Sequence, residues 1–237
     1  MKGPPGLKPV AGPIANSFED LDFFMRCVVE AEPWKYDTAA FAVGWNVPSS
    51  LPSTLTIGVL PEDPHFPLHP PVRRALEDAV HKLQAKGHRI VRLPKSGDNE
   101  FLDTAFISRV AFEYFIYTPH DNSVLTSVDE PPIKSVALMS SPMFTGPMPA
   151  DLGNKDVLGL IEQLHNARAG IADSWRQLWV REKLDVLLCP GAQNTAVPHD
   201  TYGWPPYTVI WNVLDVSYML LSFCVCLPAA VWLTCII

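Results

Sequence analysis

Four side chains that can bind a metal ion or move a proton crowd the segment EDPHFPLHPP: Glu62, Asp63, His65 and His69. Two histidines at H-x₃-H spacing form a metal-binding pair when a helix places both imidazoles on one face. The prolines between these histidines prevent that helical turn. We therefore interpret the segment as a loop that leads into a helix, and we predict no metal site.

A second group combines a nucleophile, a base and a carboxylate: Cys189, His199 and Asp200. Such groups are often mounted at strand ends, and together they could form a covalent-catalysis triad. Cys189, however, lies inside the apolar strand DVLLCP. A thiol in that setting is typical of an inert core residue, which is the interpretation we favour.

The adjacent hydroxyls of Ser140 and Ser141 lack a glycine-rich backbone that could supply an oxyanion hole. We expect them in a turn before Pro142. No P-loop and no G-x-G-x-x-G follows a predicted strand, so the sequence gives no support for a nucleotide cofactor. The residues alone assign no catalytic side chain, no cofactor and no metal.

Composition excludes other classes. The chain has 237 residues, and a hydrophobic share of 48% argues against disorder. Its net charge of −7 argues against nucleic-acid binding. Five cysteines at uneven spacing resemble no disulfide framework, and we expect a reducing, cytoplasmic setting. They are Cys27, Cys189, Cys224, Cys226 and Cys235.

The elements that would position these groups follow an α/β pattern. A helix is expected over 18–30, capped by Ser17 and Asp20, and an ordered loop over 31–54. A strand at LTIGV, a helix that begins at Pro70 and stops at Gly87, and the strand HRIVRLP then predict a β–α–β unit with parallel strands.

Further helices are expected over about 100–117 and from Lys155 onward, separated by a proline-rich stretch over 119–149 that could border a pocket. A buried strand is predicted over 185–190. The fold class is therefore α/β, with helices flanking a sheet.

The final 22 residues, Val216 to Ile237, contain no charged residue and no histidine. A segment of this length can cross a bilayer as a helix. Pro228 interrupts that helix, and no Lys or Arg flanks it. A membrane partner through Val216 to Ile237 is an alternative, and we favour an apolar extension that does not insert.

Three segments carry a resemblance: GPIANSFEDLDFFMRCVV, HPPVRRALEDAVHKLQAKGHRIVRLP and DVLLCPGAQNTAVPHD. In this order and spacing they resemble the C-terminal half of amidase-signature hydrolases, particularly the acetamidase-like branch common in fungi. The resemblance spans about Lys8 to Asp215. It implies a partial α/β/α amidase-signature fold with a mixed sheet flanked by helices: residues 1–215 would be the truncated C-terminal part of the amidase domain, and residues 216–237 an apolar tail unrelated to the family.

The resemblance also implies an activity, which is hydrolysis of a small-molecule amide to a carboxylate and ammonia or an amine. The family uses a Ser, a cis-Ser and a Lys, all in motifs that precede the matched region. Lys2, Lys8 and Ser140 lie in no such motif. We therefore carry over no catalytic residue and expect a truncated, inactive amidase-family chain. The alternatives are a binding protein that associates with a full-length relative and a tail-anchored membrane protein.

Overall fold

The computed structural model describes residues 6–7, 12–38, 40, 42–45, 50, 52–94, 99–117, 127–131, 134, 157–201, 205–215, 218–223 and 231–236. The chain forms two compact units, Pro9–Ser53 and a larger one made of Met1–Lys8 with Thr54–Ile237. Ser140 and Ser141 lie outside the described residues.

The smaller unit contains α1 (Phe18–Glu30) and a short 3₁₀ helix, η1 (Pro33–Lys35). The side chain of Ser17 caps α1 by accepting a hydrogen bond from the backbone N–H of Asp20 at 3.1 Å. None of the residues of α1 is buried. Its bounds match the predicted helix, and η1 is one turn of regular structure within the segment expected to be a loop.

The larger unit is built on a five-stranded sheet with the order β2-β1-β3-β5-β4. Strands β1, β2 and β3 run parallel, whereas β5 is antiparallel to both β3 and β4. The sheet is therefore mixed. The strands are β1 (Thr56–Val59), β2 (Arg89–Arg92), β3 (Val186–Pro190), β4 (Tyr218–Phe223) and β5 (Val231–Ile236).

The predicted β–α–β unit is present, with α2 (Pro70–Ala85) connecting the parallel strands β1 and β2. Gly87, at φ 89°, ends the connection in a left-handed conformation that suits glycine. The apolar stripe of α2 faces the core, and its buried members are Val72, Ala75, Leu76, Ala79 and Val80.

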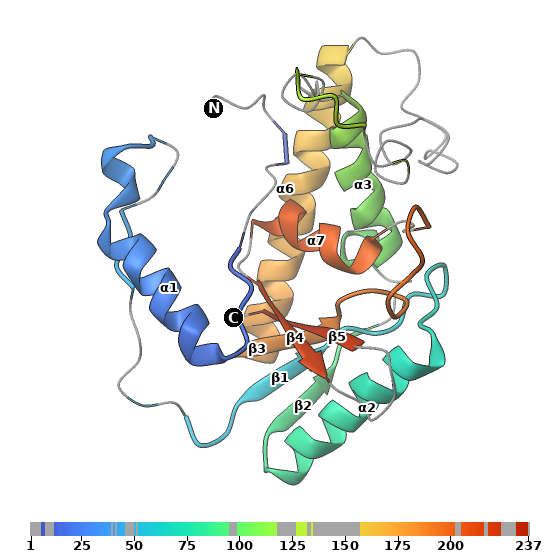
Figure 1. Cartoon of the computed structure of the whole chain (residues 1–237). Coiled ribbons are helices and arrows are strands. Elements are labelled where there is room, and N and C mark those ends of the chain that lie inside the picture. Colours follow the sequence, from blue (N-terminus) through green and yellow to red (C-terminus); the bar gives the residue numbers. More distant parts are fainter. Residues whose placement is uncertain are drawn as a thin grey trace. The chain divides into compact units, whose positions relative to one another are not determined.

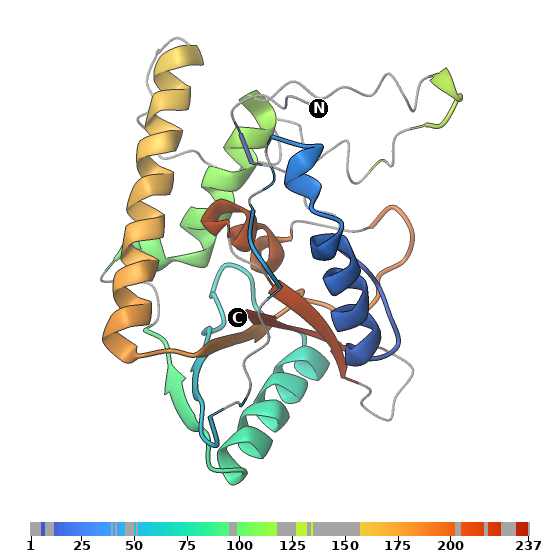
Figure 2. The same ribbon diagram turned by 90° about the vertical axis from the view of Figure 1, so that its left-hand side faces the viewer.

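Figures 1 and 2 show α2 on one side of the sheet and three other helices on the opposite side, so the sheet is covered on both faces. These helices are α3 (Thr104–Tyr117), α6 (Val157–Glu182) and α7 (Pro206–Leu214). A 3₁₀ turn, η2 (Glu100–Leu102), precedes α3. The single helix expected over 100–117 is thus divided, because the Asp103 carboxylate accepts hydrogen bonds from the N–H groups of Ala105 and Phe106 and starts a new helix there.

The core is closely packed where the sheet meets these helices. A Cβ atom at Gly58 in β1 would lie 2.8 Å from Cδ1 of Leu187, which is its register partner in β3. On the helical side, Trp175 of α6 and Trp211 of α7 pack edge to face with ring centroids 5.7 Å apart. Both indoles are buried.

The segment considered as a membrane helix forms strands β4 and β5 instead, which pair with each other from Tyr218 with Ile236 to Phe223 with Val231. Apolar runs do not distinguish buried strands from a helix by periodicity, and Pro228 lies between these two strands. Among the described residues, no helix has the length and apolar character needed to cross a membrane.

Candidate functional site

The loops that follow β1 and β3 lie at one edge of the sheet because parallel strands end at the same edge. They are joined directly. The backbone N–H of His69 donates to the carbonyl of Gln193 at 2.8 Å, and that of Leu60 donates to the carbonyl of Leu188 at 3.0 Å. In open α/β sheets this edge is where ligands bind. This edge of the sheet is therefore the candidate functional site.

Asp63 is the centre of this edge. It is 4% exposed, and its Oδ1 accepts from the backbone N–H of His65 at 2.8 Å and lies 3.1 Å from Nδ1 of the same residue. Its Oδ2 accepts at 3.1 Å from the backbone N–H of Ala105 at the start of α3, and the same N–H also donates to Oδ1 of Asp103 at 2.7 Å. One buried carboxylate thus fixes the β1 loop, the His65 ring and the start of α3.

Tyr207 of α7 reaches the same loop from the other end of the sequence. Its hydroxyl accepts from the backbone N–H of Asp63 at 3.0 Å and donates to the carbonyl of Phe66 at 2.8 Å. Burial raises the pKa of Tyr207 to about 12, and the negative charges of nearby acidic groups add to that shift. The phenol therefore remains protonated and remains a donor at neutral pH.

Glu62, the neighbour of Asp63, forms its hydrogen bonds with a residue of α2 and with the backbone that precedes this helix. Its carboxylate accepts from Nε of Arg73 at 2.8 Å and from Nη2 at 2.5 Å, and it also accepts from the backbone N–H of Leu68. The hydrogen bond to Glu62 raises the pKa of the Arg73 guanidinium. Within the part of the chain that the structure describes, no group of three His, Cys, Asp or Glu side chains could hold a metal ion.

The second sequence-derived group is divided between the core and the surface. Cys189 is fully buried near the end of β3 and lies close enough to Tyr207 to contribute to the raised pKa of that phenol. His199 and Asp200 are exposed on the segment that follows β3. The thiol is thus enclosed by the core while the proposed base faces solvent, and this arrangement gives no accessible nucleophile.

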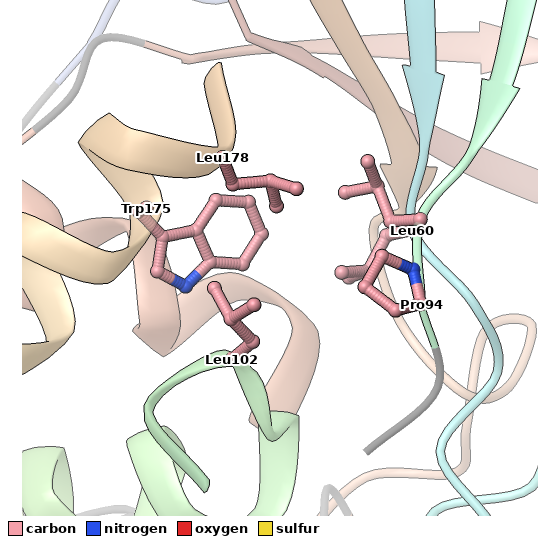
Figure 3. Close-up of a pocket in the computed structure, with 6 residues that line it drawn as sticks. Leu60, Pro94, Leu102, Trp175 and Leu178 are labelled. Atoms are coloured by element: carbon pink, nitrogen blue, oxygen red, sulfur yellow. The ribbon is translucent and has the colours of Figure 1, made fainter. Parts of the chain in front are cut away.

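Two cavities adjoin the helical layer. The first, of about 10 Å³, lies between the ends of β1 and β2 and helix α6, and holds about one water molecule at most. Figure 3 shows Trp175 and Leu178 on one side of it and Leu60 and Pro94 on the other. The second, of about 310 Å³, is a groove between α6 and α7. Its lining is mainly apolar and comprises Ala172, Trp175, Arg176, Trp179, Val180, Trp211 and Leu214.

Comparison with known proteins decides the family. The sequence model of the amidase family matches residues 6–231. The chain belongs to the amidase family. An amidase from Gibberella moniliformis is 33% identical over 228 residues, which cover 94% of this chain and 40% of that protein. An acetamidase from Aspergillus oryzae is 26% identical over 226 residues, covering 92% and 40%.

A solved structure supports the amidase fold. The structure of a fatty acid amide hydrolase superposes with a TM-score of 0.74 at 22% identity and covers 97% of this chain and 45% of that one. The chain thus spans about two fifths of the length of the curated amidase relatives it matches. The family predicted from the three sequence segments is confirmed, and so is the α/β fold class with its mixed sheet.

Sequence reasoning identified Asp63 and His65 as members of a polar cluster but missed how they are held. Tyr207 went unnoticed because it lies in a short, mostly apolar segment and is 144 residues away from Asp63 in the chain. The one available signal was an acidic residue four positions after a buried strand, where a carboxylate commonly caps a neighbouring element.

Proposed function

We propose that these 237 residues are the C-terminal portion of an amidase-family hydrolase and do not hydrolyse amides by themselves. The parent reaction would convert a carboxylic acid amide to a carboxylate and ammonia or an amine. The observation that carries the proposal is coverage: the match takes in 94% of this chain and 40% of the Gibberella moniliformis amidase. The sequence also has no Gly/Ser-rich segment like the signature of the amidase-signature family.

The residues considered for covalent catalysis supply no accessible nucleophile for amide hydrolysis. The most reactive side chain among the sequence candidates, Cys189, is fully buried. The carboxylates Glu62 and Asp63 are engaged by Arg73 and by backbone N–H groups. A reaction that needs an activated nucleophile and an adjacent base loses a factor on the order of 10⁶ in turnover without them.

Ammonia release tests the proposal. The purified chain is incubated with acetamide and with benzamide beside a full-length fungal amidase at equal concentration, and ammonia is measured over time. We expect no release above the buffer rate from the chain. Release proportional to chain concentration would overturn the proposal, and loss of that release in Cys189→Ala would identify the thiol as the nucleophile.

A second function, a binding protein that associates with a full-length amidase, is favoured by one observation. Helix α1 carries four large apolar side chains that are 39% to 69% exposed, namely Phe18, Phe23, Phe24 and Val28. An apolar face of this kind is typical of a surface that another polypeptide covers. Co-purification of a tagged chain with an untagged full-length relative tests it, with Phe23→Ser as the variant expected to weaken recovery.

For the cellular setting we propose the cytoplasm. The support is that, within the described part of the chain, Cys27 and Cys189 form no disulfide bond, as expected of a protein in a reducing compartment. Fractionation of cells that express the tagged chain tests this assignment.

A further inference from the structure

The loop after β1 presents a histidine that a buried carboxylate orients. We propose that Asp63 and His65 form an acid–base pair in which Nε2 of His65 acts as a general base toward water, giving the chain a weak esterase activity toward small activated esters. This activity is separate from amide hydrolysis and does not rest on the proposed function.

The hydrogen bonds determine which ring nitrogen is free. The Asp63 carboxylate is the acceptor for two backbone N–H groups, those of His65 and Ala105, so it offers lone pairs and not a proton. Its Oδ1 lies 3.1 Å from Nδ1 of His65. Nδ1 must therefore carry the hydrogen, and Nε2 of the neutral ring keeps its lone pair.

The pair is held rigidly from several sides. Tyr207 binds the backbone on both sides of His65, at the N–H of Asp63 and the carbonyl of Phe66. The far side of the carboxylate is fixed by the start of α3 through Ala105. The backbone hydrogen bonds place the loop, and the contact with Asp63 orients the ring, and positioning of that kind favours catalysis.

The free nitrogen faces solvent. The side chain of His65 is 70% exposed although that of Asp63 is only 3% exposed, and Nε2 has no partner among the residues that the structure describes. The loop also lies at the carboxyl edge of the parallel strands, where ligands of α/β proteins bind. A buried carboxylate behind an accessible imidazole is the arrangement by which Asp–His pairs deprotonate a nucleophile.

The reaction needs no further reagent. Nε2 takes a proton from water as the water oxygen bonds to the ester carbonyl carbon, and the C–O bond then breaks with its electron pair leaving on a phenolate. The imidazolium returns its proton to solvent, so ester and water give carboxylic acid and phenol. A phenolate leaves without being protonated, whereas an amine must gain a proton to leave. The substrates are therefore small phenyl esters and not amides.

Hydrolysis of p-nitrophenyl acetate by the intact chain tests the proposal. We expect His65→Gln to lower the protein-dependent rate at least about tenfold, since a positioned general base contributes this much or more. His199→Gln is the matched control, because His199 is also exposed on a loop at the same edge, but within the described part of the chain no carboxylate contacts its ring. Equal rates for the His65 variant and the parent chain, or an equal fall in both variants, would overturn the proposal.

A second measurement does not depend on turnover. In ¹⁵N-labelled chain, the imidazole shifts of His65 in its neutral form should show hydrogen on Nδ1 and a lone pair on Nε2. The opposite tautomer would refute the pair even if some hydrolysis persists. Asp63→Asn should shift the balance between the two tautomers of His65 toward that of an imidazole without a carboxylate partner. The far-ultraviolet circular dichroism of this variant shows whether the fold is retained.

Discussion

Helices α1 and α2 begin at recognisable sequence signals and carry apolar stripes of similar kind, yet their surroundings differ. Five apolar residues of α2 are buried, whereas α1 has none, and Phe23 of α1 is 69% exposed. Periodicity along the chain determines that a helix forms and which face is apolar. What covers that face is decided by residues distant in sequence, so the same local pattern produced a core helix in one unit and an exposed helix in the other.

The largest expected difference between the two units concerns core aromatic residues. Trp211→Ala should lower the free energy of unfolding by about 3–5 kcal/mol, because it empties a buried site beside Trp175. Phe23→Ala in the smaller unit should change it by no more than about 0.5 kcal/mol. Urea unfolding followed by circular dichroism measures both, and similar losses would show that the contrast between the units is false.

The next prediction compares how a buried carboxyl group and an exposed one make stability depend on pH. Burial raises the pKa of Glu113 on α3 to about 7, with the positive charge of Arg109 opposing the shift, whereas an ordinary glutamate has a pKa of 4.5. Between pH 4.5 and 7 the folded chain keeps a proton that the unfolded chain has lost. Stability should therefore fall as pH rises through this window, by about 3 kcal/mol in all.

Glu113→Gln should remove that fall, which urea unfolding at pH 5 and pH 8 would reveal. The pKa shift of Asp22 in the smaller unit is in the opposite direction, because hydrogen bonds from Trp45 and Arg26 lower its pKa. Its stabilising contribution is present at neutral pH and is lost on acidification. A Glu113→Gln chain that keeps the parent's pH dependence would contradict the assignment.

A smaller loss is expected from one hydroxyl group at the strand edge. Tyr207→Phe leaves the backbone N–H of Asp63 and the carbonyl of Phe66 without their buried partner, and should cost about 1–3 kcal/mol. Tyr36→Phe is the control in the smaller unit, where the ring is 86% exposed. Thermal unfolding compares the two, and a neutral Tyr207→Phe would mean that the loop is not held from α7.

The smallest effect concerns the helix starts. Ser17→Ala removes the side-chain cap of α1 and should weaken that helix by about 1 kcal/mol, with Ser17→Asp restoring it. His69, at the same position in α2, makes no side-chain cap hydrogen bond. Hydrogen exchange of the first-turn amides should respond to the change in α1 and not to His69→Ala in α2.

Much of the fold could be predicted because each amphipathic element is a local pattern. The bounds of α1, the β–α–β unit and strand β3 all agree with the sequence interpretation. Helix α7 could not be found in this way. It has only nine residues, most of them apolar and buried, and its polar face consists of the half-buried Thr208 and Asn212 alone, so the 3.6-residue period extends over barely two turns.

The candidate site was less predictable than the fold. The proximity of Asp63 and His65 is visible in the sequence, but the burial of that carboxylate is not. It depends on Ala105 and Tyr207, which lie 42 and 144 residues away in the chain. The same dependence on distant partners explains why β4 and β5 were not foreseen, since an apolar segment becomes a strand only where another strand is available to pair with it.

The position of β5 has a consequence for how the chain is made. It lies between β3 and β4, although residues 231–236 are the last strand along the described chain. During translation, β1, β2 and β3 can pair once residue 190 has left the ribosome, but β4 must wait, because its pairing is to β5. A nascent chain that stalls before residue 231 would therefore expose the edge of β3 and an unpaired β4 together, and both edges would be open to aggregation until synthesis finishes.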